Sequence, residues 1–191
     1  MTGKIILVNG ASSSGKSTLC RALQANLEEP FWHYSIDHFR NTGVLPAQHL
    51  AQGAFLEPGM RAKFFEGFHR CLPALAGAGN NLIVEHIVET RAWMIRLVQL
   101  LGPFDVFLVG LHCPLAELEQ RERKRGDRRA GEARQDYATV HSFGTCDIEI
   151  DSMRRLEDNV DALLAAWRSR TRPNAFDRML AAEGGAPQIA P

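Results

Sequence analysis

The chain has 191 residues, of which 45% are hydrophobic, so it is long enough for one well-filled core and short for two. Its 22 basic and 22 acidic residues cancel, which argues against binding to nucleic acid or to a membrane surface by bulk charge. The 4 cysteines form no C-x-x-C pair and no apolar segment is long enough to span a membrane, so we expect a reduced, cytoplasmic protein.

The first apolar run, residues 5–8, has the β-branched character of a strand that is buried on both faces. The small-residue loop after it fits G-x-x-x-x-G-K-[ST], and a helical pattern follows. Backbone N–H groups of such a loop, with the positive end of the helix, can surround a phosphate. An ordinary Gly/Ser turn is the alternative, but the flanking strand and helix are the context that the motif requires. The residues expected to bind a nucleoside triphosphate are Gly10, Ala11, Ser12, Ser13, Ser14, Gly15, Lys16, Ser17 and Thr18.

Two side chains of this loop have specific roles in the hypothesis. Lys16 would bridge the outer phosphates and so act in catalysis, and we expect it to be accessible to solvent before nucleotide binds. The hydroxyl of Ser17 would coordinate the Mg²⁺ ion that accompanies ATP.

The second apolar run, residues 33–36, ends at Asp37. Ligands of a parallel sheet bind beyond the carboxyl ends of the strands, so this carboxylate would face the phosphates held by the first loop. It can accept the proton of a substrate hydroxyl as that oxygen attacks the γ-phosphorus, which makes Asp37 the predicted catalytic base. Asp before a helix is also a common N-cap, and one residue can do both.

The segment of residues 38–80 is long for a single crossover, and from Pro58 it has the pattern of a helix with Phe64, Phe65 and Phe68 on one face. Such rings are more often core than ligand pocket. An insertion after the strand that carries the base is still where a small kinase would build its acceptor site, and aromatic walls suit an apolar substrate.

The third run, residues 82–84, ends at Glu85, where P-loop enzymes usually carry an acidic residue that holds magnesium directly or through water. A buried, unpaired carboxylate is costly, which argues for a cation or a donor nearby. His86 is ambiguous, because one histidine is more often a structural group than a ligand or a base. Ser17 and Glu85 are therefore the predicted metal-binding residues.

The densest charge of the chain lies in residues 120–135, after a fourth apolar run at residues 106–111. Gly126 interrupts the arginine cluster, as a hinged lid that swings arginines onto a triphosphate would need. We expect a lid at residues 120–137, in which Arg125 and Arg128 contact the phosphates and assist catalysis. A solvated helix face is the alternative. RNA binding is disfavoured, because no aromatic platform is interleaved with the cluster.

A fifth run, residues 148–150, completes a rhythm of strands that alternate with helical segments. This alternation predicts an α/β fold with a parallel sheet and right-handed crossovers. We expect a single domain over residues 1–171. A loosely held tail is expected at residues 172–191, because a Gly-Gly pair and 3 prolines surround one short helical patch there.

Four stretches together resemble the chloramphenicol phosphotransferases of antibiotic-producing bacteria: VNGASSSGKS, EPFWHYSID, RERKRGDRRAG and VHSFGTCDIEIDS. The likeness covers nearly all of residues 4–165, and the R-G-D-R-x-A-G block followed by V-H and D-x-E-x-D is its most specific part. It departs from the family at Glu85-His86, where the family has a pair of aspartates, and in the acceptor region around residues 40–65.

The resemblance implies a three-layer P-loop kinase fold, with a five-stranded parallel sheet and helices on both faces. It further implies ATP and Mg²⁺ as cofactors, a base at Asp37, and transfer of the γ-phosphate to a primary hydroxyl of a small aromatic amphiphile.

Three functional hypotheses follow. The first is ATP-dependent O-phosphotransfer to a small hydroxyl compound, with chloramphenicol as the candidate antibiotic. The second is a P-loop kinase of another acceptor, such as a nucleotide sugar in the manner of zeta-type toxins, a nucleoside or a sugar. The third is a nucleotide-dependent regulator without catalysis, which would need no base at Asp37. The sequence does not indicate an oligomeric state.

Overall fold

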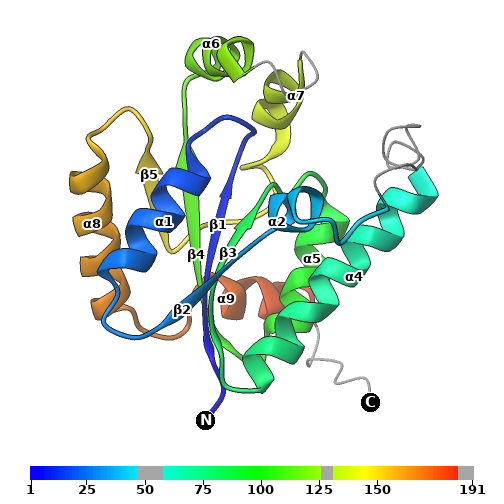
Figure 1. Cartoon of the computed structure of the whole chain (residues 1–191). Coiled ribbons are helices and arrows are strands. Elements are labelled where there is room, and N and C mark those ends of the chain that lie inside the picture. Colours follow the sequence, from blue (N-terminus) through cyan, green and yellow to red (C-terminus); the bar gives the residue numbers. More distant parts are fainter. Residues whose placement is uncertain (47–57, 126–130, 185–191) are drawn as a thin grey trace.

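A five-stranded sheet lies at the centre of the computed structural model, which describes residues 1–46, 58–125 and 131–184 (Figure 1). The order of the strands is β2-β3-β1-β4-β5, and every neighbouring pair is parallel, as the sequence predicts. The carboxyl ends of all strands therefore meet at one edge of the sheet. The strands are β1 (Lys4–Gly10), β2 (Phe31–Ser35), β3 (Asn81–His86), β4 (Asp105–His112) and β5 (Ile148–Asp151).

Alternate residues of the central strand belong to two hydrophobic cores, one on each face of the sheet. In β1, Ile5 and Leu7 pack into one core, and Ile6 and Val8 pack into the other. All four are fully buried. A strand with a core on both faces can be apolar throughout, which explains the continuous run at residues 5–8.

Helices cover both faces of the sheet, so the fold has three layers, as expected (Figure 1). The helices of one face are α1 (Lys16–Asn26) and α8 (Leu156–Ser169). Those of the other face are α4 (Pro58–Gly77), α5 (Arg91–Leu101) and α9 (Ala175–Ala182). Three more lie at the edge where the strands end: α2 (Ile36–Asn41), α6 (Leu115–Arg125) and α7 (Glu132–Thr139).

The helix predicted from Pro58 is α4, and its aromatic residues contribute to the core. Phe68 stacks on Tyr34 with ring centroids 4.8 Å apart, and Phe65 stacks on Trp93 at 4.2 Å. Both phenylalanines are buried. Residues 47–57 of the predicted insertion lie outside the described residues.

The prediction of a loosely held tail from residue 172 is wrong for the part that the structure describes. Residues 175–182 form α9, which begins with a capping box between Asn174 and Asp177. Phe176 is 1% exposed and belongs to the same core as α4 and α5. One large apolar side chain and a capped first turn hold the helix, despite its short length.

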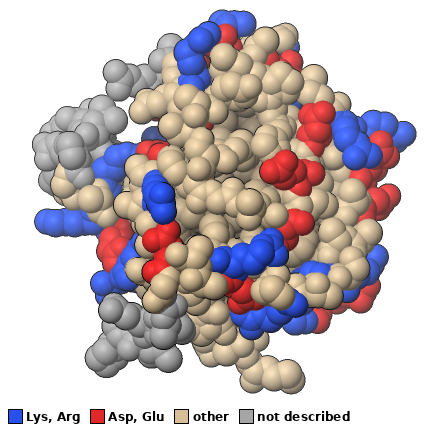
Figure 2. Space-filling model, turned by 180° about the vertical axis from the view of Figure 1, so that it is seen from behind, with Lys and Arg blue, Asp and Glu red and all other residues tan. Residues whose placement is uncertain are grey.

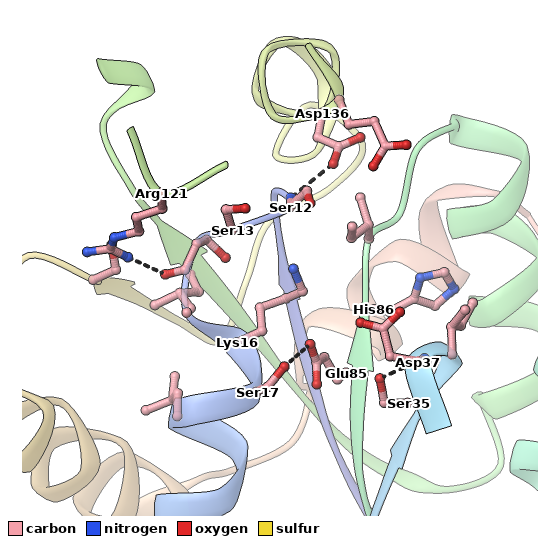
Figure 3. A pocket seen from close by; sticks show the side chains of 18 of the residues that line it. Ser12, Ser13, Lys16, Ser17, Ser35, Asp37, Glu85, His86, Arg121 and Asp136 are labelled. Atoms are coloured by element: carbon pink, nitrogen blue, oxygen red, sulfur yellow. Dashed lines mark hydrogen bonds between the residues drawn. The ribbon is translucent and has the colours of Figure 1, made fainter. Parts of the chain in front are cut away.

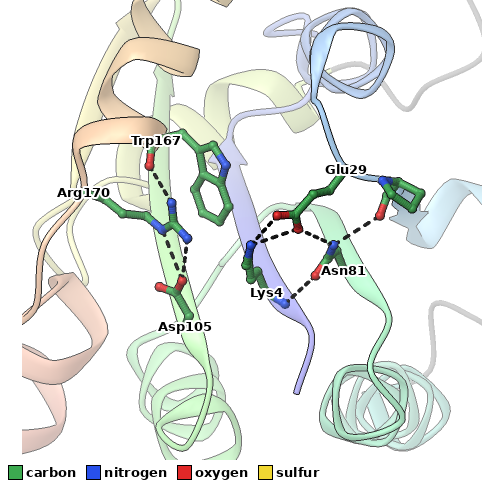
Figure 4. A network of polar contacts seen from close by, with 7 residues as sticks. Lys4, Glu29, Asn81, Asp105, Trp167 and Arg170 are labelled. Carbon is green, nitrogen blue, oxygen red and sulfur yellow. Dashed lines mark hydrogen bonds and ion pairs between the residues drawn. The ribbon is translucent and has the colours of Figure 1, made fainter. Parts of the chain in front are cut away.

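Polar contacts join the strands at the edge opposite to the one where they end (Figure 4). Lys4 donates to both carboxylate oxygens of Glu29, at 2.6 and 2.9 Å, and Asn81 bonds to the backbone of Lys4 and to Glu29. Arg170 donates to Asp105 at 2.7 Å. These ion pairs are partly exposed, so each contributes little to the stability of the fold.

The surface reflects the balanced composition. On the face shown in Figure 2, basic and acidic side chains lie interspersed around a broad area of uncharged residues. Among the described residues, no helix is both long and apolar enough to cross a membrane.

Candidate functional site

A cleft of about 1240 Å³ opens at the edge where the strands end. Its walls come from the loop of residues 10–17 (the glycine loop), from the ends of β2 and β3, from α4, and from the α6–α7 arm (residues 115–125 and 131–139) (Figure 3). Parallel sheets bind ligands at this position, so the cleft is the candidate active site.

Backbone geometry explains both glycines of the glycine loop. A Cβ atom on Gly10 would lie 2.8 Å from the carbonyl oxygen of Leu111, so no other residue fits against β4. Gly15 has φ 99°, and Ser13 also takes the left-handed conformation, with φ 64°. Left-handed residues on either side of Ser14 give the loop the concave backbone that binds anions.

Two hydroxyl groups of the loop are suited to an anion. The Oγ atoms of Ser13 and Ser14 are buried and have no hydrogen-bond partner within the described part of the chain. Buried polar groups are normally paired, so these hydroxyls fit a loop that receives an anion. Ser12 to Thr18 line the cleft, whereas Gly10 lies against β4 and Ala11 is buried.

Lys16 is folded back onto its own loop. Its Nζ donates to the carbonyl oxygen of Ala11 at 2.8 Å, and the side chain is buried, so the expectation that it is accessible to solvent is wrong. Burial lowers the pKa of Lys16, and the negative charges of Glu85 and Asp136 act in the opposite direction. An arriving phosphate can replace the Ala11 carbonyl as the acceptor of this ammonium group.

Ser17 and Glu85 meet as the predicted metal site requires. The hydroxyl of Ser17 donates to Glu85 Oε1 at 2.8 Å, and the other carboxylate oxygen lies 3.1 Å from Nε2 of His33. Burial of Glu85 raises the pKa of its carboxyl, but the hydrogen bond with His33, the charge of Lys16 and the hydrogen bond from Ser17 outweigh it and lower the pKa. Glu85 is therefore ionised at neutral pH.

Asp37 lies in the first turn of α2 and lines the same cleft. The N-cap of α2 is Ser35, whose hydroxyl accepts from the backbone N–H of Asp37 at 3.3 Å. The alternative reading of Asp37 as the cap is therefore wrong, and Asp37 lines the cleft from the first turn of α2. Arg40, one turn later, places Nη1 3.9 Å from the carboxylate.

One of the two predicted arginines lies in the described α6–α7 arm. Arg125 ends α6 and lines the cleft, whereas Gly126 and Arg128 lie outside the described residues. Glu122 of α6 accepts backbone hydrogen bonds from Ala133 and Gly131, at 2.8 and 2.9 Å, at the start of α7. These bonds lower the pKa of Glu122 and join the two helices.

Two residues of the arm touch the glycine loop and were not singled out from the sequence. Arg121 donates through Nη1 to the carbonyl oxygen of Ser14 at 3.2 Å, and Asp136 accepts from the backbone N–H of Ser12 at 2.9 Å. Arg121 belongs to the charged stretch of residues 120–135 and Asp136 directly follows it, but only the orientation of the two helices tells which charges face the loop.

The far end of the cleft has an aromatic wall. Arg61 forms an ion pair with Glu89, and its guanidinium lies over the ring of Phe65, 4.5 Å from the centroid. His86 also lines the cleft, stacks on Phe65 and is 2% exposed, and its Nε2 lies 2.7 Å from Nε2 of His69. Burial holds the pKa of His86 well below its ordinary value, so its imidazole is neutral at neutral pH.

Residues 3–168 match the model of the family described as chloramphenicol phosphotransferase-like protein. The chain belongs to this family. The resemblance carried by the four sequence stretches is thereby confirmed. The protein named "Putative O-phosphotransferase Rv2636" of Mycobacterium tuberculosis (strain ATCC 25618 / H37Rv) is 26% identical over 204 residues, which cover 93% of this chain and 88% of that protein.

Solved structures of P-loop kinases share the fold of this chloramphenicol phosphotransferase-like protein. The APS kinase CysC of Mycobacterium tuberculosis, in complex with AMPPNP and APS, superposes with a TM-score of 0.68 at 19% identity, covering 88% of this chain and 99% of that one. A gluconokinase from Sinorhizobium meliloti 1021 gives a TM-score of 0.62 at 17% identity and covers 96% of both chains. The predicted P-loop kinase fold is confirmed.

Proposed function

We propose that the protein is an ATP-dependent O-phosphotransferase, which moves the γ-phosphate of ATP to a hydroxyl group of a small molecule. The observation that carries this proposal is that the glycine loop, the Ser17–Glu85 pair and Asp37 line one cleft. A nucleotide-dependent regulator would need the loop but not the carboxylate of Asp37. Membership in the phosphotransferase-like family supports the same reaction.

The glycine loop would bind the phosphates of ATP. Its unpaired hydroxyls and left-handed turns fit a polyanion, and Lys16 would exchange its bond with the Ala11 carbonyl for one with a phosphate oxygen. Arg125 and Arg128 would stabilise the charge that develops on the transferred group.

Ser17 and Glu85 would hold Mg²⁺ beside these phosphates. A hydroxyl and an ionised carboxylate are the hard oxygen ligands that Mg²⁺ prefers, and here they are already within hydrogen-bond distance. When bound, the ion supplies charge neutralisation for the phosphates.

Asp37 would orient the acceptor hydroxyl and take its proton late in the transfer. The wall formed by Phe65, with Arg61 stacked on it, suits an acceptor that has both an aromatic or apolar part and polar groups. A small aromatic amphiphile such as chloramphenicol is the first acceptor to test.

The proposal is tested by a screen of hydroxyl compounds with purified protein, ATP and Mg²⁺, read as ADP release. The screen includes chloramphenicol, nucleosides, sugars and nucleotide sugars, and we expect at least one to stimulate ADP release. Stimulation by another acceptor without chloramphenicol would move the substrate to that class. ATP binding with no stimulated release would favour the regulator.

Asp37→Asn separates catalysis from binding. It removes the base but keeps the shape of the side chain, so we expect turnover to fall at least about 100-fold with nearly unchanged ATP affinity. Asp161→Asn, on the exposed side of α8, is the matched control. Normal turnover of Asp37→Asn would contradict the assignment of the base.

A further inference from the structure

Behind the Ser17–Glu85 hydrogen bond lies a second group of possible ligands, formed by Cys20 of α1, His33 of β2 and Glu85 of β3. Each residue offers one ligand atom, and these three atoms lie within 4.8 Å of one another: a sulfur, a ring nitrogen and a carboxylate oxygen. Cys20 is fully buried, and the side chains of His33 and Glu85 are 7% and 10% exposed. Three separate elements thus bring three different ligand types to one enclosed point.

The chemistry of this group differs from that of a magnesium site. Mg²⁺ selects oxygen ligands, whereas a thiolate with an imidazole and a carboxylate selects Zn²⁺ and related ions. We propose that Cys20, His33 and Glu85 bind a thiophilic divalent cation such as Zn²⁺, and that this ion inhibits the enzyme. The inhibition rests on the proposed function, but binding of the ion does not.

Cys20 also has an ordinary role, because it packs in the core between α1 and the sheet. Burial raises the pKa of its thiol, so Cys20 is no reactive nucleophile in the absence of a metal. Binding of the ion would transfer the thiol proton to solvent and replace the contact between His33 and Glu85 by two bonds to the metal.

Glu85 links this site to the phosphates. Glu85 and Ser17 line the cleft, so the ion can enter from there. Glu85 Oε1 faces Ser17 while Oε2 faces His33, so one carboxylate would be shared by the two cations. Two divalent cations on a shared carboxylate repel each other, and we expect Zn²⁺ to weaken the binding of MgATP.

Cobalt is the direct probe, because a thiolate bound to Co²⁺ gives a charge-transfer absorption in the near ultraviolet. Co²⁺ is titrated onto the full-length, nucleotide-free protein under reducing conditions, and Zn²⁺ is then added. We expect the band to appear, to be lost when Zn²⁺ displaces Co²⁺, and to be lost in Cys20→Ser. Cys113→Ser, which changes another buried cysteine, is the matched control and keeps the band.

His33→Gln is the second variant, since a glutamine amide can still donate to Glu85 but is a poor metal ligand. We expect Co²⁺ to bind at least about tenfold more weakly to it. Circular dichroism checks that each variant is folded. If Cys20→Ser does not fold, the affinity of His33→Gln for Co²⁺ tests the site instead. No thiolate band in the folded wild type, or a band that survives in folded Cys20→Ser, would overturn the site.

Inhibition is measured separately in the phosphotransfer assay at saturating Mg²⁺. We expect Zn²⁺ to raise the KM for MgATP. The Zn²⁺ concentration that does so should be at least about tenfold lower for the wild type and for Cys113→Ser than for Cys20→Ser. Equal Zn²⁺ sensitivity of Cys20→Ser and the control would overturn the inhibitory role. The cobalt spectrum needs neither ATP nor acceptor, so a failure of the proposed function would leave that spectrum unchanged.

Discussion

The carboxylate of Asp136 accepts a hydrogen bond from the backbone N–H of Ser12, with Oδ2 2.9 Å from the nitrogen. A side chain of the α6–α7 arm therefore places a negative charge on the loop that we propose to bind phosphate. An incoming triphosphate has to displace this charge or bind beside it.

Asp136→Asn is expected to bind ATP more tightly, by about three- to tenfold, because it removes a like charge near the phosphates. Isothermal titration calorimetry with ATP measures the change. Glu132→Gln, which removes a negative charge from the same helix and the same cleft, is the control. Weaker ATP binding by Asp136→Asn than by the control would mean that Asp136 supports the loop.

Arg121→Ala tests the contact between α6 and the glycine loop. Loss of the bond to the Ser14 carbonyl and of a positive charge at the cleft should raise the KM for ATP by about five- to tenfold. The control is Arg123→Ala, which removes an exposed arginine from the same helix. If both variants gave the same KM, the bond to Ser14 would have no part in nucleotide binding.

The buried pair of His69 and His86 predicts a loss of stability in acid. Burial lowers the pKa of His69 to about 4, from an ordinary value of 6.5. Between these values the unfolded chain binds a proton that the folded protein does not. The free energy of unfolding should therefore fall by about 1.4 kcal/mol per pH unit per histidine as the pH drops below 6.5.

His69→Gln removes one of these two titrating groups. The free energy of unfolding should then fall less steeply with decreasing pH, by the contribution of one histidine. Urea unfolding at about pH 7 and about pH 5 measures the slope for both proteins. An unchanged slope in the variant would show that His69 is protonated in the folded state.

Phe176→Ala tests the role of α9. Removing a ring that is 1% exposed should lower the free energy of unfolding by about 3–5 kcal/mol. Arg178→Ala, at an exposed position of the same helix, is expected to cost under about 1 kcal/mol. Equal stability of the two variants would mean that α9 is loosely held, as the composition predicts.

Local patterns were sufficient to predict the strands and the glycine loop. A strand, a small-residue loop and a helix follow one another at residues 5–23, and neighbours in sequence determine all three. The pairing of Ser17 with Glu85 also followed, because parallel strands end at one edge. The helix α9 did not, because its stability comes from the burial of Phe176 against distant residues.

Tertiary orientation explains what was missed at the site. Arg121 and Arg125 are four residues apart on one helix, and composition does not tell which of them reaches the Ser14 carbonyl. The contact of Asp136 with Ser12 depends on how α7 lies over the loop, and the burial of Lys16 depends on the position of the Ala11 carbonyl.

Glu122 has a practical consequence for engineering. Because its carboxylate accepts hydrogen bonds from the backbone N–H groups of Gly131 and Ala133, it joins α6 to the first residues of α7. A fluorescent reporter attached to the exposed side of either helix would therefore follow the movement of both.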